Sequence, residues 1–150
     1  MNLTDYTPAA LATCEARSYD LEYLLPGLIG EVGELFGEVA REHRLGTGRT
    51  DQVIAEYGDI AWMTAVLLDH LKVDDIQQLG NLRFVNGREA ALELILARAA
   101  AVYRSGSDVL PGRAAALWST LADHAEAVTG VSFGKVLRTN LEKLAARHGG

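Results

Sequence analysis

No stretch of this 150-residue chain alternates apolar and polar residues with a period of two, the pattern typical of a half-buried β-strand. Where a period is visible, as in Leu28, Val32, Leu35 and Val39, apolar residues recur at three- and four-residue spacing. That spacing places side chains on one side of a helix. The sequence therefore predicts an all-α fold.

Helix start and stop signals divide the chain further. Thr7-Pro8 has the form of an N-cap followed by the first residue of a helix, Pro26 opens a second helix, and Gly46 ends it after a basic last turn. A short turn or helical piece is expected at 74–79, and Asn86-Gly87 breaks the chain. The helices that these signals predict run over about 7–17, 26–45, 51–72, 88–104, 112–128 and 132–147.

Length and composition indicate one folded domain over residues 1–150. The chain is long enough to bury a core, and 49% of its residues are apolar, more than a disordered segment carries. There is no uncharged apolar run of about 18 residues, so no segment is expected to span a membrane. The net charge of −6 argues against a protein that coats nucleic acid.

The compartment is expected to be the cytoplasm. The first residues lack the basic and then apolar layout of a secretion signal. The single cysteine, Cys14, cannot form an internal disulfide and leaves no cysteine cluster for a metal.

Two short acidic pairs carry most of the functional information: Glu31-Val32-Gly33-Glu34 and Glu56-Tyr57-Gly58-Asp59. On a helix, this spacing sends both carboxylates of a pair to the same side, about one turn apart. Four carboxylates from two neighbouring helices would form an all-oxygen pocket, which suits a hard divalent cation better than zinc or copper. The hypothesis of a metal site requires the two helices to be antiparallel neighbours.

The setting of the second pair strengthens this hypothesis. Asp59 is followed at once by a long apolar run, 60–68, which predicts a heavily buried helix. Burying unpaired carboxylates costs several kcal/mol unless a cation or hydrogen bonds compensate. The alternative is that these acids only favour the helix N-terminus; it is reasonable for Glu56 and weaker for Asp59.

The first pair lies beside glycines at 30, 33 and 37 within one predicted helix. Each glycine costs about 0.5–1 kcal/mol there relative to alanine, which is easier to understand if a helix, a partner subunit or a ligand comes close. A di-iron bundle is excluded as the metal site, because it needs Glu-x-x-His on two helices and no acidic residue here has histidine three positions later.

The predicted C-terminal helix places Asn140, Lys143 and Arg147 on one face. Lysine and arginine bind phosphate oxygens, the first as a point charge and the second as a planar fork. The alternative is that these cations complement the dipole at the end of the helix. Together with the acidic pairs, they favour metal-assisted phosphate chemistry.

The ordered combination of these motifs resembles the MazG-type all-α nucleoside triphosphate pyrophosphohydrolases. The match covers residues 5–72 and, less closely, 131–147, whereas 84–128 is unmatched. The residues that carry it are Gly27-Leu28-Ile29-Gly30-Glu31-Val32-Gly33-Glu34-Leu35, Glu56-Tyr57-Gly58-Asp59-Ile60, and Asn140-Leu141-Glu142-Lys143-Leu144 with Arg147.

This resemblance implies a four-helix-bundle-like core with extra helices. It implies a Mg²⁺ site, with Mn²⁺ as an alternative ion, formed by Glu31, Glu34, Glu56 and Asp59, with Glu38 as an outer-shell candidate. The reaction implied is hydrolysis of a nucleoside triphosphate to the monophosphate and pyrophosphate. We expect a homodimer or a dimer of dimers. Two alternatives stay open: phosphoribosyl-ATP as the substrate, and an inactive helical binding or regulatory module.

Overall fold

The computed structural model describes residues 1–46, 48–73 and 83–148. In this part of the chain there are helices and no strands, which confirms the predicted all-α fold. The elements are α1 (Leu3–Leu11), a 3-10 turn η1 (Ala16–Ser18), α2 (Leu21–Leu45), α3 (Thr50–His70), α4 (Arg88–Tyr103), α5 (Leu110–Thr129) and α6 (Phe133–His148). The helical piece expected at 74–79 lies outside the described residues.

The first helix begins earlier and ends earlier than its Thr7-Pro8 signal predicts. Asn2 is the N-cap, and its side chain accepts a hydrogen bond from the Asp5 amide at 2.9 Å. Thr7 is inside the helix, where its hydroxyl donates back to the Leu3 carbonyl. The expected continuation to residue 17 is wrong, because α1 ends at Leu11 and only a 3-10 turn follows.

The second helix also begins before its expected proline. Asp20 caps it by accepting from the Glu22 amide at 2.8 Å, so Pro26 lies inside α2 instead of opening it. Its C-terminal signal is confirmed: Gly46 has a φ of 67° and its amide bonds to the Glu42 carbonyl. Glycine adopts this left-handed conformation without the steric cost that other residues have.

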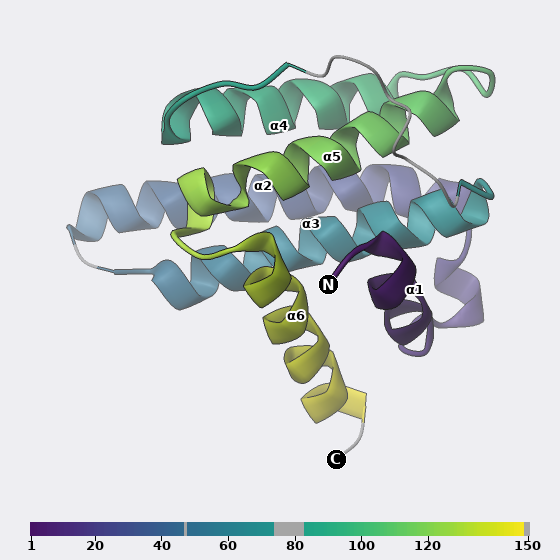
Figure 1. Ribbon diagram of the computed structural model, residues 1–150, viewed down its shortest axis with the longest axis horizontal. Helices are drawn as coiled ribbons and strands as arrows, with labels where there is room; N and C mark the ends of the chain where they lie inside the picture. The colour runs from purple at the N-terminus through teal and green to yellow at the C-terminus, as the bar shows by residue number, and fades with distance from the viewer. Residues whose placement is uncertain (47, 74–82, 149–150) are drawn as a thin grey trace.

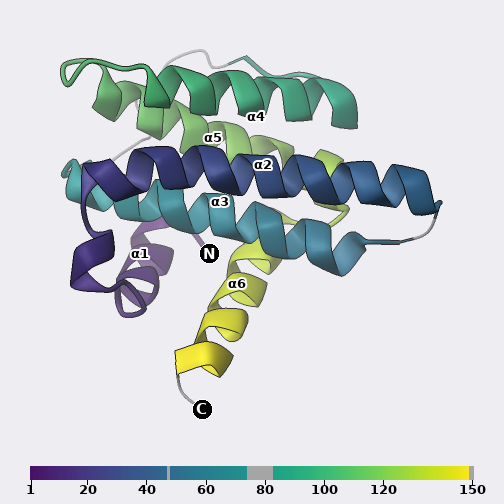
Figure 2. The same ribbon diagram turned by 180° about the vertical axis from the view of Figure 1, so that it is seen from behind.

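Four long helices, α2 to α5, lie side by side, and α1 and α6 extend from one side of this bundle (Figure 1). The helix α3 is central, since it packs against α1, α2, α5 and α6. Twelve of its residues are buried, which confirms the heavily buried helix expected after Asp59. The opposite view shows α2 crossing in front of α3 and running antiparallel to it (Figure 2).

The helices of the unmatched segment belong to the same core. α4 packs on α5 and on α2, and buried residues of α2 to α5 form one continuous apolar cluster. Arg88, at the start of α4, forms a two-bond ion pair with Glu42 of α2, with nitrogen–oxygen distances of 2.7 and 3.3 Å. Within the described ranges, no helix is long and apolar enough to cross a membrane.

Candidate metal centre

Three of the predicted acidic residues meet between α2 and α3. Glu31 comes from α2, and Glu56 and Asp59 come from adjacent turns of α3. Carboxylate oxygens of the three residues lie within 4.8 Å of one another, and each residue is half-buried. An all-oxygen group of this kind fits a hard cation such as Mg²⁺ or Mn²⁺. Such a cation commonly keeps several of its waters, so three protein carboxylates suffice to hold it.

The electrostatics of this group favour a cation. Burial, followed by the charges of Asp59 and Glu56, raises the pKa of Glu31 from 4.5 to about 7. Burial and the charges of Asp59 and Glu34 also raise the pKa of Glu56. Like charges that the fold holds close together disfavour ionisation. A bound divalent cation would relieve this repulsion.

Helix α6 brings two further predicted residues to the same group. Asp59 Oδ1 accepts hydrogen bonds from Lys143 Nζ at 2.5 Å and from Asn140 Nδ2 at 3.3 Å. The Asn140 amide oxygen in turn accepts from the Tyr6 hydroxyl at 2.5 Å, and both of these side chains are buried. In this structure Asn140 and Lys143 therefore contact a carboxylate, and the bonds from Tyr6 through Asn140 orient Asp59.

A glycine in the second acidic motif makes this approach of α6 sterically feasible. A Cβ atom on Gly58 would lie 3.0 Å from the Cβ of Asn140 and 3.3 Å from its amide nitrogen. These distances are shorter than ordinary van der Waals contact. Gly58 is thus needed where α3 and α6 cross, one residue from Asp59.

The other two predicted acids on α2 are not part of the group. Glu34 is exposed and lies outside the three residues whose oxygens converge, although its charge contributes to the raised pKa values of Glu31 and Glu56. Glu38 is buried, and its two oxygens accept bonds from Arg41 at 2.8 Å and Arg49 at 2.9 Å. The bond from Arg49 connects the later part of α2 to the residue before α3, whereas the bond from Arg41 lies within α2.

A pocket of about 410 Å³ adjoins the acidic group, and its volume is in the range of small-molecule sites. Trp62 forms part of its wall and donates through Nε1 to the Ala10 carbonyl and the Thr13 hydroxyl, which holds the end of α1 against α3. The exposed Arg147 also lines it. The residues of this pocket that bear charge are Glu15, Arg17, Glu31, Asp59 and Arg147.

Sequence reasoning missed the part that the N-terminal segment plays in this site. Tyr6 is buried and contacts Asn140 from 134 positions away in the chain. A buried tyrosine hydroxyl needs a polar partner. The sequence could therefore suggest that Tyr6 has such a partner, but not that the partner is Asn140. Arg17 and Thr13 had no local signal, because they become pocket residues only after the chain folds back along α3.

The raised pKa of Glu31 predicts how metal-free protein responds to pH. The unfolded chain releases this proton near pH 4.5, whereas the folded protein holds it to about pH 7. The folded state binds more protons in this window, so its stability falls as pH rises from about 5 to 7.5. Thermal unfolding in the presence of a chelator measures this effect, and Glu31→Gln should flatten it. A stability that increases through the window, or the same fall in Glu31→Gln, contradicts the prediction.

Comparison of the chain with protein-family models, with curated proteins and with solved structures finds no match in any of the three. The arrangement of the six described helices and the half-buried acidic triad are therefore interpreted through their own geometry and charge. On that basis the chain is an all-α protein with a cluster of three carboxylates able to hold a divalent cation.

Proposed function

We propose that this protein is a Mg²⁺-dependent nucleoside triphosphate pyrophosphohydrolase, which releases the nucleoside monophosphate and pyrophosphate. The observation that carries the proposal is the convergence of Glu31, Glu56 and Asp59 beside a pocket and two cations of α6. The resemblance of the acidic motifs and of the C-terminal helix to MazG-type enzymes points in the same direction. The cytoplasm, where nucleotide pools are found, is the expected compartment.

Each group of residues has a task in this reaction. Glu31, Glu56 and Asp59 would hold Mg²⁺, with Glu34 within electrostatic reach of them. Bound Mg²⁺ supplies Lewis-acid chemistry, since it neutralises phosphate oxygens and lowers the pKa of a bound water.

The cations and the pocket would receive the substrate. The bond of Lys143 to Asp59 and the location of Arg147 beside the pocket support this role, since cations attract the oxygens of a polyphosphate chain. The pocket beside Trp62 would take the remainder of the nucleotide.

A pyrophosphate-release screen tests the proposal. The intact chain is incubated with each common ribo- and deoxyribonucleoside triphosphate, and with phosphoribosyl-ATP, in Mg²⁺, in Mn²⁺ and in a chelator. We expect release that requires the divalent ion and prefers some bases to others. Release of orthophosphate instead of pyrophosphate would identify a different phosphate reaction. No release from any of these substrates would contradict the proposal.

One observation favours a second candidate, an inactive binding or regulatory module of the same fold. Lys143 already neutralises part of the acidic group through its 2.5 Å bond to Asp59, as expected of a purely structural ion-pair cluster. In that case Mg²⁺ would not raise the unfolding temperature. A measurable rise with millimolar Mg²⁺ distinguishes the metal site from the structural cluster.

A homodimer is the expected assembly. Gly30 and Gly33 are exposed, and a Cβ at either would meet nothing within 4 Å in the described part of the chain. Within the described part of one protomer, no other element therefore comes close to these two glycines. Size-exclusion chromatography with light scattering should give a mass of about 32 kDa, twice the 16.2 kDa of the chain. A monomer at micromolar concentration would refute the dimer.

A further inference from the structure

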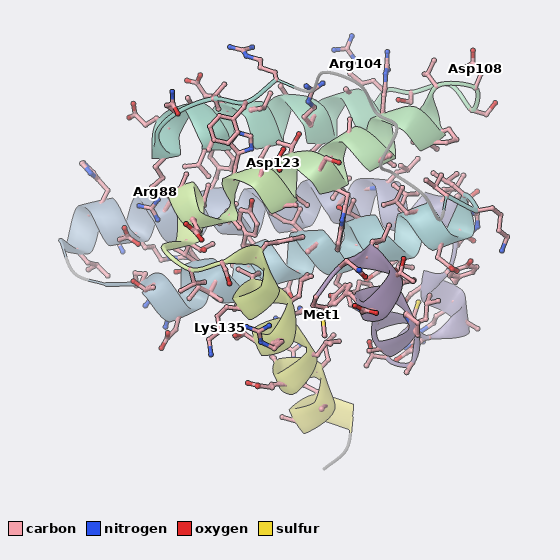
Figure 3. All side chains as sticks on the ribbon, viewed as in Figure 1. Met1, Arg88, Arg104, Asp108, Asp123 and Lys135 are labelled. Atoms are coloured by element: carbon pink, nitrogen blue, oxygen red, sulfur yellow. The ribbon has the colours of Figure 1, made fainter. Side chains whose placement is uncertain are left out.

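Three arginines gather around a second pocket, where the end of α4 packs beside α5. The pocket has a volume of about 470 Å³ and is lined by Arg98, Ala101, Arg104, Arg113 and Ala116. Arg104 lies at the end of the bundle where the chain passes from α4 to α5, on the same side as Asp108 of the connecting loop (Figure 3). No lining residue of this pocket is shared with the one beside the acidic group.

No carboxylate of the described residues forms an ion pair with the arginines of this pocket. Across residues 1–46, 48–73 and 83–148, none of the three arginines takes part in an ion pair. This is unexpected in a chain that carries a net charge of −6. Guanidinium groups stay charged at any physiological pH, so the pocket has a permanent positive potential.

Within the described part of the chain, most guanidinium donors of this pocket form no hydrogen bond. The Nε atom of Arg98 is buried and has no hydrogen-bond partner among the described residues. A buried donor without a partner is rare, because it has lost its water without a replacement. Arg113 uses one nitrogen, Nη1, for the Ala101 carbonyl and the Ser105 hydroxyl, and no bond is formed by its other donors in the described part of the chain.

Stabilisation of the end of α4 explains only part of this arrangement. Cations near the last carbonyls of a helix are favourable, and the bond from Arg113 to Ala101 has this role. It does not account for Arg98, whose Nε has no carbonyl or carboxylate partner in the ranges that the structure describes. Arg98 and Arg104 also line one pocket of about 470 Å³, which is larger than a single phosphate group.

We propose that Arg98, Arg104 and Arg113 form a binding site for a diphosphate or longer phosphate chain, separate from the acidic group. Several guanidinium forks bind phosphate oxygens through paired, charge-assisted bonds. The other lining residues, Ala101 and Ala116, are small and offer no aromatic surface for a base. The ligand is therefore recognised by its phosphates, which either inorganic pyrophosphate or the tail of a nucleotide provides.

Calorimetric titration of the intact chain in a chelator tests this site without the metal centre. We expect pyrophosphate to bind with 1:1 stoichiometry and orthophosphate at least tenfold more weakly. Arg98→Gln and Arg104→Gln should each weaken pyrophosphate binding at least tenfold. ATP and GTP form the second arm: equal affinities no higher than that of pyrophosphate identify the inorganic anion, and higher affinities identify a nucleotide.

Two control variants keep the test decisive. Arg44→Gln makes the same charge change at the end of α2, at the opposite end of the bundle (Figure 1), and should leave the affinity unchanged. Arg138→Gln removes an exposed charge of α6 that lies outside both pockets, and it should also leave the affinity unchanged. Arg104 is exposed, so Arg104→Gln carries the test if Arg98→Gln does not fold. Absence of pyrophosphate binding, or its loss in a control variant and not in the pocket variants, overturns the proposal.

Discussion

Replacing Glu56 with alanine is expected to lower Mg²⁺-dependent pyrophosphate release by about 100-fold or more, since loss even of residues that only support metal ligands has effects of 10- to 100-fold. The same substitution should increase the stability of the metal-free protein. Burial and neighbouring carboxylates raise the pKa of Glu56, so removing its charge relieves repulsion. Initial rates and thermal unfolding in a chelator measure the two effects.

Glu93→Ala is the matched control, because Glu93 is an exposed helical glutamate on α4 and loses the same charge. Its activity should stay close to that of the unchanged protein. The divalent-dependent rise in unfolding temperature should vanish in Glu56→Ala and persist in Glu93→Ala. Pyrophosphate release that survives Glu56→Ala would remove this residue from the proposed site.

The second large effect is expected from Gly58→Val. Even a single Cβ at this position would lie 3.0 Å from the Cβ of Asn140, and valine adds two methyl groups to it. Overpacking of this kind costs about 1–3 kcal/mol, which outweighs the few tenths of a kcal/mol that valine gains over glycine in a helix. We expect the unfolding temperature to fall by about 5–10 °C, measured by circular dichroism.

Gly112→Val tests whether this effect comes from the contact or from the residue type. A Cβ on Gly112 would meet nothing within 4 Å, so its unfolding free energy should change by no more than about 0.5 kcal/mol. If α6 is displaced in Gly58→Val, the bonds of Asn140 and Lys143 to Asp59 are lost as well. Equal stability of the two valine variants would show that the crossing of α3 and α6 is not close packed.

Local signals predicted the helices well wherever the responsible residues are neighbours in the chain. Gly46 ends α2, Asn86-Gly87 precedes α4, and the apolar run after Asp59 is a buried helix. The two wrong helix starts both concern prolines. Thr7-Pro8 and Pro26 were interpreted as helix starts, but the caps Asn2 and Asp20, each bonded to a nearby amide, begin those helices five or six residues earlier. Pro8 and Pro26 are each the sixth residue of their helix, where proline removes one backbone hydrogen bond. A proline therefore does not by itself define a helix start.

The candidate site was predicted in part. Two acidic pairs on helical spacing gave no reason to prefer one acid over another, and the packing of α2 on α3 selected Glu31, Glu56 and Asp59. Glu38 shared the face of Glu31 and Glu34 but is bound by Arg41 and Arg49. Arg49 precedes α3, and its distance from Glu38 depends on how the chain turns between the two helices.

The sequence by itself determined the helical class, several helix ends and the side of each helix on which its acids lie, because these depend on residues within one or two turns of each other. Only the tertiary structure decided which acids converge, that Lys143 and Asn140 meet Asp59, and that Tyr6 supports them from the other end of the chain. Arg98, Arg104 and Arg113 likewise share a pocket only because α4 folds back on α5. The physical reason is that the packing of whole helix faces sets the distances between helices, and no local pattern contains them.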